Sequence, residues 1–252
     1  MPPSVWDVAL DEWVDGTPVY AGDSFIDYRA RTSFPSARTL TSLSIQDFAG
    51  LPRLLRERHV AVFRLGAGRF ALVQMPGPEA LKQLFIFDEE VFPDSIRDVA
   101  PINEELLSVY SMVNKHSETN LINLALASGC LAEALQLDEH RTFPPAATAQ
   151  STFDFLFRPT SSLPDVLLEH RNGQIEVDAL FLAPLHGRRT LFVLEGKNEL
   201  NYGGKGSLSK SKLFYASEAV AQGSAERASN RARIPPGVAT WRRGGIPRCA
   251  LC

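Results

Sequence analysis

The chain has 252 residues, of which 44% are hydrophobic and 22% charged, and its formal net charge is -3 at pH 7. This length and apolar content indicate an ordinary globular protein with one large or two small domains. The small net charge argues against a uniformly basic nucleic-acid-binding protein, but it says nothing about local basic patches.

Targeting and cysteine patterns predict a cytoplasmic protein. No run approaches the roughly 18 consecutive apolar residues of a membrane span, and the first residues lack the basic and apolar regions of a signal peptide. Cys130 stands alone, and Cys249 and Cys252 form a single CxxC pair with no further zinc ligands nearby. Structural zinc is therefore not expected, because it needs four ligands.

The N-terminal region, residues 1–100, is predicted to be a small α+β unit. After a mixed stretch rich in turn formers, residues 51–77 read as a helix, a strand from Val60 to Leu65, a Gly-Ala-Gly turn and a second strand from Arg69 to Gln74. Two strands joined by a short glycine turn are typical of a hairpin.

Residues 101–222 are predicted to alternate between helices and strands. Helical spacing of apolar residues indicates helices over 101–116 and 117–137, the second with Ser117 as N-cap and Glu118 in its first turn. An antiparallel meander follows over 151–198, with a turn expected at Asn172-Gly173, and then a helix over 207–222. Residues 223–252, rich in Arg, Gly and Pro, are predicted to be a disordered tail or a truncated end.

An acid and a base stand two residues apart at the end of one apolar strand. The stretch Leu191 to Leu194 predicts a buried strand, and Glu195 and Lys197 would then share one strand face. Asp178 is expected on the neighbouring strand, so that two carboxylates and an ammonium meet at one end of the sheet. Carboxylate oxygens suit Mg²⁺, which could hydrolyse a phosphodiester with Lys197 orienting the attacking water.

This pattern resembles the PD-(D/E)xK nuclease superfamily, in which an acid on one strand is followed by E-x-K on the next. The matching residues are Asp178 and then Glu195, Gly196 and Lys197, within a similarity that covers roughly residues 115–222. The resemblance implies a restriction-endonuclease-like mixed sheet flanked by helices, with Glu118 on the preceding core helix as a further metal carboxylate. The carbonyl of Gly196 would be another Mg²⁺ ligand.

The same resemblance implies a type II restriction-like enzyme that cuts double-stranded DNA, and a homodimer would suit symmetric cleavage. Residues 1–100 would then serve DNA recognition or dimerisation. Five residues around the E-x-K motif are candidates for DNA contact: Lys205, Lys210, Lys212, Asn198 and Tyr202.

Alternative interpretations remain open for these residues and for the function. Glu195 and Lys197 also fit a solvated ion pair, and Glu118 also fits an acid stabilised by the helix dipole. Glu176 competes with Asp178 for the metal, because both would share a strand face. The alternative functions are a non-catalytic DNA-binding or interaction protein with a degenerate nuclease core, and a DNA repair or junction nuclease of the same superfamily.

Overall fold

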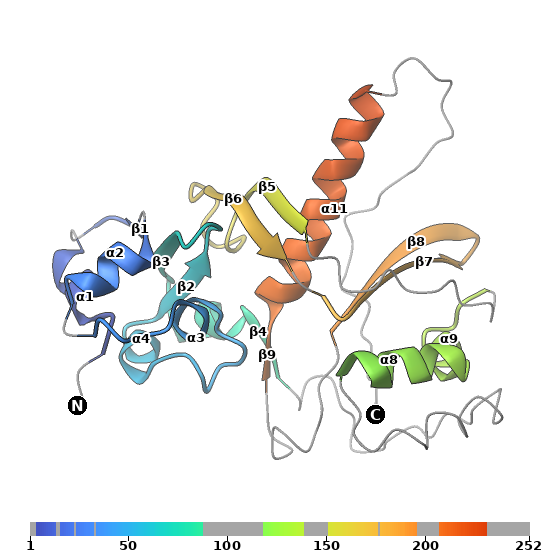
Figure 1. Cartoon of the computed structure of the whole chain (residues 1–252), viewed down its shortest axis with the longest axis horizontal. Helices are drawn as coiled ribbons and strands as arrows, with labels where there is room; N and C mark the ends of the chain where they lie inside the picture. The colour runs from blue at the N-terminus through green and yellow to red at the C-terminus, as the bar shows by residue number, and fades with distance from the viewer. Residues whose placement is uncertain are drawn as a thin grey trace. The chain divides into compact units, whose positions relative to one another are not determined.

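The computed structural model describes residues 4–13, 16–22, 24–32, 34–87, 118–138, 151–175, 177–195 and 207–230 (Figure 1). The chain forms two compact units, each built from three segments. Unit 1 comprises residues 1–87, 151–175 and 206–214, and unit 2 comprises residues 88–150, 176–205 and 215–252. This division differs from the expected boundaries at residues 100 and 222, because strands from the middle of the chain pair and pack within the N-terminal unit.

Helices and antiparallel strands make up both units, which confirms the α+β class. Within the described ranges every strand pair is antiparallel, so a single mixed sheet is not seen there. None of the described helices has the length and apolar character needed to cross a membrane.

Unit 1 contains a three-stranded sheet in the order β1-β3-β2 and two strand pairs, β4-β9 and β5-β6. Its strands are β1 (Val19–Gly22), β2 (Val60–Arg64), β3 (Phe70–Gln74), β4 (Phe85–Phe87), β5 (Ser151–Phe157), β6 (Leu168–Ile175) and β9 (Ser207–Ser209). Its helices are α1 (Asp7–Glu12), α2 (Phe25–Ala30), α3 (Thr39–Leu43), α4 (Arg53–Glu57) and α5 (Pro78–Lys82). The predicted helix, strand, glycine turn and strand are confirmed as α4, β2 and β3, with Gly66 and Gly68 at positive φ in the turn.

An aromatic cluster joins α1 and α2 to one face of the three-stranded sheet. Phe70 of β3 is fully buried, and its ring centroid lies 5.4 Å from that of Trp6 and 5.2 Å from that of Tyr28. The Tyr28 hydroxyl donates to the carbonyl of Val5 and accepts from the amide of Ala9 at 3.1 Å. Burial raises the pKa of Tyr28 to about 12, so the phenol stays protonated at neutral pH.

The β5-β6 hairpin packs its aromatic face on the same sheet through Phe63 and Phe157, whose ring centroids are 5.8 Å apart. The turn predicted at Asn172-Gly173 is wrong, because both residues lie inside β6. Phe153 pairs with Gly173 and Phe155 with His170, which leaves a β-bulge between them. Asn172 takes the bulge conformation at φ 46°, a region that Asn tolerates better than most residues.

His170 is the most enclosed charged or titratable side chain of the hairpin, with 1% exposure. Its ring stacks on Phe155 at a centroid distance of 4.5 Å, and its Nδ1 lies 3.1 Å from the carbonyl oxygen of Phe153. Burial lowers the pKa of His170, and the nearby positive charge of Arg64 lowers it further. The imidazole is therefore neutral at pH 7 and donates its Nδ1 proton to Phe153.

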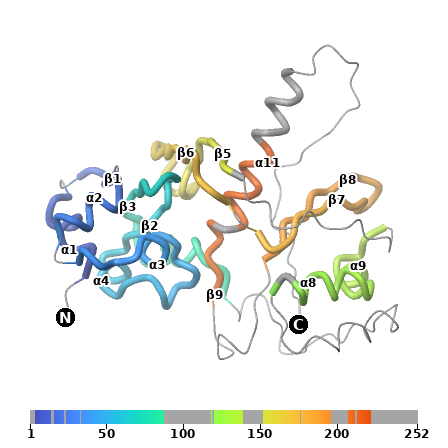
Figure 2. Tube along the Cα trace, viewed as in Figure 1, coloured from blue at the N-terminus to red at the C-terminus, as the bar shows by residue number. Residues whose placement is uncertain are grey.

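Unit 2 contains α8 (Glu118–Ala127) and α9 (Cys130–Ala134), which pack on a hairpin of β7 (Ala179–Leu185) and β8 (Arg188–Leu194). Figure 2 shows the two helices lying along the hairpin. The helix predicted over 117–137 is broken into two at Gly129, which adopts φ 78°. A left-handed glycine of this kind ends a helix without steric cost.

Two further predictions are wrong in part: the strand expected through Asp178 and the helix expected over 207–222. The strand expected through Asp178 is interrupted, since β6 ends at Ile175 and β7 begins at Ala179. The helix expected over 207–222 begins later and ends later, as α11 (Lys210–Asn230) after strand β9. Of the residues predicted to form a tail, 223–230 are helical, because the Ala, Glu and Arg residues among them favour helix. Residues 231–252 lie outside the described structure.

Candidate functional site

The β7-β8 hairpin brings Asp178 and Glu195 to the same end of a strand pair. The strands pair from Leu185 with Arg188 to Ala179 with Leu194, so the next residues outward are Asp178 and Glu195. The predicted neighbourhood of the two strands is confirmed, and it places both carboxyl residues at the open end of the hairpin.

The hairpin connection is a two-residue turn that the chain encodes locally. His186 has φ 52° and Gly187 has φ 71°. Two successive residues at positive φ are the mark of a type I′ turn, which matches the twist of the strands that it joins. Because a two-residue turn fixes the register, the pairing of Ala179 with Leu194 at the far end follows from it.

One face of the hairpin is buried against the two helices. The core cluster combines Ile122, Leu126, Leu131, Ala132 and Leu137 of the helical segment with Ala179, Phe181, Ala183, Phe192 and Leu194 of the strands. Phe181 and Phe192 stack within it at a centroid distance of 4.9 Å. Since side chains alternate along a strand, one further step places Asp178 and Glu195 on the opposite face, next to Leu180 and Val193. Both carboxyl residues are half-buried.

Asp138 ties the helical segment to the turn of the hairpin. Its carboxylate accepts from the amides of His186 at 2.9 Å and Gly187 at 2.7 Å, and its own amide donates to Pro184 at 3.2 Å. Sequence reasoning missed this residue, because the contact joins positions 48 and 49 residues apart and has no local pattern. Asp138 fixes how α9 meets the hairpin.

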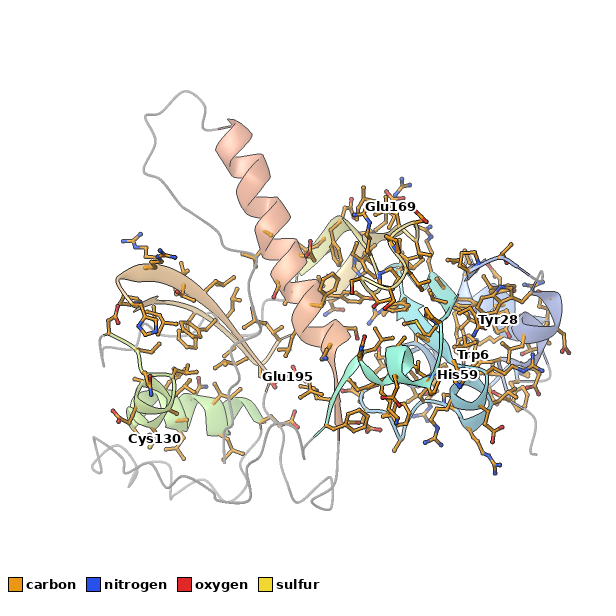
Figure 3. All side chains as sticks on the ribbon, turned by 180° about the vertical axis from the view of Figure 1, so that it is seen from behind. Trp6, Tyr28, His59, Cys130, Glu169 and Glu195 are labelled. Atoms are coloured by element: carbon orange, nitrogen blue, oxygen red, sulfur yellow. The ribbon has the colours of Figure 1, made fainter. Side chains whose placement is uncertain are left out.

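Glu118 begins α8 and is half-buried. Because Asp138 holds the end of the helical segment at the turn, α8 begins toward the open end of the hairpin, as Figure 1 shows. Glu195 is marked at the end of β8 in Figure 3. Glu118 therefore belongs to the same unit as Asp178 and Glu195, but the described structure does not group the three carboxylates around one point.

A family model described as a domain of unknown function, DUF6997, matches residues 92–218, half of the chain. The chain belongs to the DUF6997 family. The DUF6997 region includes α8, α9 and the β7-β8 hairpin and ends within α11. No curated protein and no solved structure matches the chain.

Asp178 and Glu195 are oxygen donors of the kind that hard cations bind. Mg²⁺ takes oxygen ligands, keeps several waters and often binds only one or two carboxylates, and Asp178 and Glu195 supply two at one hairpin end. A full set of three or more His, Cys, Asp or Glu side chains in metal-binding positions is not found in the described part of the chain. Among the described residues of the DUF6997 region, Asp178 and Glu195 are therefore the two carboxylates that could bind a cation together.

Of the other predicted site residues of the DUF6997 region, the structure describes only some. Gly196, Lys197, Asn198, Tyr202 and Lys205 lie outside the described residues, as do Glu176 and the side chain of Lys212. Lys210 is described, and its ammonium donates to the carbonyl of Gln83 at 2.8 Å within unit 1. This bond gives Lys210 a role in holding the start of α11 to the segment before β4.

Proposed function

We propose that the DUF6997 region is a Mg²⁺-dependent endonuclease of the PD-(D/E)xK type that hydrolyses phosphodiester bonds of duplex DNA. The observation that supports the proposal is the β7-β8 register, which ends at Ala179 paired with Leu194, one residue from Asp178 on one strand and one residue from the Glu195-Gly196-Lys197 sequence on the other. The order of an acid, a hairpin and then E-x-K is the one found in the nuclease superfamily.

In this proposal a few residues have separate roles in binding the metal ion and in orienting the attacking water. Asp178 and Glu195 would hold Mg²⁺, with the Gly196 carbonyl as a further ligand and waters in the remaining positions. Bound Mg²⁺ supplies a water of lowered pKa and stabilises negative charge on the phosphate. Lys197, two residues after Glu195, would orient the attacking water and offset charge as the phosphorus–oxygen bond to the leaving strand breaks.

Contacts with the DNA backbone would come from the residues that follow the E-x-K motif. The candidates are Lys205, Lys210, Lys212, Asn198 and Tyr202. Each phosphate contact made by a lysine releases counterions, so binding is expected to weaken steeply as salt rises. Residues 1–100 would add recognition or dimer contacts.

Cleavage of supercoiled plasmid by the full chain tests the proposal. We expect nicked and linear products with MgCl₂ and none with EDTA, and a roughly 10²–10⁴-fold slower reaction for Lys197→Ala. Asp178→Asn should be inactive as well. Glu133→Gln, an exposed acid of α9 in the same unit, is the matched control and should cleave normally.

The outcomes separate the candidate functions. DNA binding without cleavage by the native chain, in Mg²⁺ or Mn²⁺, would refute the enzyme and favour the non-catalytic DNA-binding alternative. Cleavage confined to branched or damaged substrates would favour a repair or junction nuclease. Cleavage that survives Asp178→Asn would show that the activity resides elsewhere or in a contaminant.

A further inference from the structure

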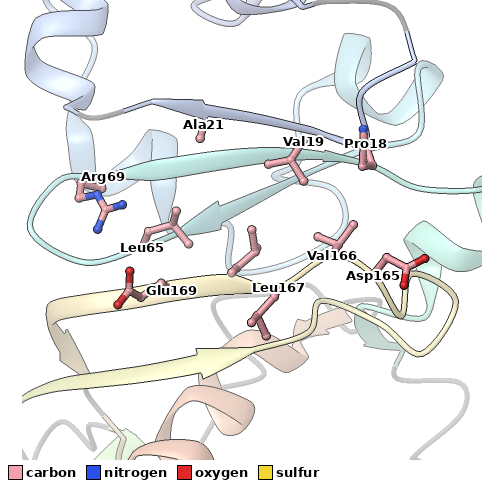
Figure 4. A pocket seen from close by; sticks show the side chains of 10 residues that line it. Pro18, Val19, Ala21, Leu65, Arg69, Asp165, Val166, Leu167 and Glu169 are labelled. Carbon is pink, nitrogen blue, oxygen red and sulfur yellow. The ribbon is translucent and has the colours of Figure 1, made fainter.

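Unit 1 contains a groove over one face of its three-stranded sheet, between β1 and the segment that leads into β6, which we call the β1 groove. Val19 and Ala21 of β1 form one wall and residues 165–169 form the other, and Leu65 and Arg69 of the β2-β3 connection complete the lining (Figure 4). The volume of the groove is about 370 Å³. Ligand sites commonly occupy about 300–1,000 Å³, so the groove can take several side chains of a partner.

The groove is the uncovered margin of a sheet face that is packed elsewhere. Ala21 lies on the same face as Phe63, because Ala21 pairs with Ala71 and Ala71 pairs with Phe63. The β5-β6 hairpin covers this face at Phe63 through the ring of Phe157. Toward β1 the cover is incomplete, since Ala21 is exposed and Leu167 on the opposite wall is 52% exposed.

The lining combines an apolar centre with opposite charges at its two ends. Leu65 and Val166 are 4% and 5% exposed and form the centre. Figure 4 shows Arg69 at one end and Asp165 at the other. Neither of these charged side chains forms an ion pair within the described structure.

The two charged ends lie about three turns of an α-helix apart. Arg69 directly precedes β3, and Gln74 at the other end of β3 donates to the carbonyl of Pro18, which lies at the same end of the groove as Asp165 in Figure 4. The strand from Arg69 to Gln74 spans about 17 Å at about 3.4 Å per residue, and about eleven helical residues have this length. Positions i and i+11 share one face of a helix, so they can reach the two ends together.

These features select among ligand classes. Nucleic acid is disfavoured, because Asp165 and Glu169 would face its phosphates. A small molecule would stay exposed on the open side of the groove, whereas such ligands usually bury about 70–90% of their surface. An added strand does not fit, because β3 is paired on both sides and the backbone groups of β1 that do not bond to β3 point away from it in the plane of the sheet. An α-helix satisfies its own backbone and presents side chains alone, which suits an apolar groove with charged ends.

We propose that the β1 groove binds an amphipathic helix of a partner protein. Apolar side chains at positions i+4 and i+7 of this helix pack over Leu65 and Val166 and against Leu167. An acid at position i meets Arg69, and a base at position i+11 meets Asp165. An acid near the N-terminus and a base near the C-terminus also suit the helix dipole. The site lies in unit 1 and does not depend on the proposed DNA cleavage.

The probe is a synthetic peptide, acetyl-Ala-Glu-Ala-Ala-Gln-Leu-Ala-Ala-Leu-Ala-Gln-Ala-Lys-Ala-amide, titrated into the full chain with ¹³C-labelled methyl groups. We expect saturable shifts of the Val19, Leu65 and Val166 methyl groups with a dissociation constant of about 0.1–1 mM, which corresponds to a weak specific contact. Replacing an alanine between the two leucines with proline should abolish binding, because proline breaks a helix.

Two variants of the chain test the assigned contacts. Arg69→Glu should weaken binding of the peptide roughly three- to tenfold, in line with a partly exposed ion pair turned repulsive, and should improve binding of a peptide with Lys in place of Glu. Leu167→Ser should weaken binding by a similar factor, because the wall loses apolar area. The matched controls are Arg58→Glu and Leu40→Ser, both exposed residues of unit 1 outside the groove, and neither should change binding.

Three results would overturn the proposal: a peptide that shifts none of the three methyl groups, a variant at Arg69 or Leu167 that binds it as the native chain does, or equal binding of the proline peptide. Shifts of the same methyl groups that grow with protein concentration, with no peptide added, would also overturn it and would assign the groove to a second copy of the chain.

Discussion

Replacing Asp138 with alanine removes the carboxylate that holds the β7-β8 turn. Two hydrogen bonds are lost, to the amides of His186 at 2.9 Å and Gly187 at 2.7 Å. Such bonds contribute about 0.5–1.5 kcal/mol each, and Asp138 is exposed, so we expect a total of about 1–2 kcal/mol. That loss would make local opening of the turn roughly 5–30 times more frequent.

Amide hydrogen exchange measures this opening residue by residue. In Asp138→Ala, the amides of His186 and Gly187 should exchange roughly 5–30 times faster than in the native chain. Asp138→Asn keeps one acceptor oxygen and should give an intermediate rate. Glu133→Ala, an exposed acid on α9, is the control and should leave both amides unchanged. Native exchange rates at both amides in Asp138→Ala would refute the assigned role of the carboxylate.

Two further predictions concern unit 1. Gly66→Ala should lower the free energy of unfolding, measured in urea, by about 2–4 kcal/mol, because the added Cβ would lie 2.1 Å from the carbonyl oxygen of Arg171. Gly68 has a similar φ but open space around it, so Gly68→Ala should lower the free energy of unfolding by only about 1 kcal/mol. Equal losses in the two variants would contradict the close approach at Gly66. Burial lowers the folded-state pKa of His170 below the ordinary 6.5, so the unfolded chain binds the extra proton and stability falls as pH drops below 6.5. His170→Phe should reduce this fall between pH 7 and pH 5, and an identical pH profile for both proteins would refute it.

Local sequence signals predicted the parts of the fold that short-range rules determine. The hairpin of β2 and β3 was found from its Gly-Ala-Gly turn, since only positive φ closes that connection. Asn172-Gly173 carries the same local signal but forms a bulge. A turn and a bulge both use positive φ, so the partner strand β5, far away in the sequence, decides between them.

The candidate site was predictable to the extent that it depends on one hairpin. Alternation and the apolar run before Glu195 were enough to predict that the two strands pair, and the pairing ends at Ala179 and Leu194, next to Asp178 and Glu195. The division into units was not predictable, because it depends on long-range packing such as that of Phe157 on Phe63. The same holds for Asp138, and for Lys210, whose bond to Gln83 gives it a structural contact that its charge alone did not indicate.

The interleaving of segments in unit 1 has a consequence for synthesis on the ribosome. Residues 1–87 emerge first, but the β5-β6 hairpin that covers Phe63 and the strand β9 that pairs with β4 come from residues 151–175 and 206–214. The unit can close only after more than a hundred further residues have been translated. Until then its apolar sheet face and the edge of β4 are exposed, which makes the nascent chain a natural client for chaperones. A fragment cut at the DUF6997 boundary would share this exposure permanently, because that boundary separates β9 from β4.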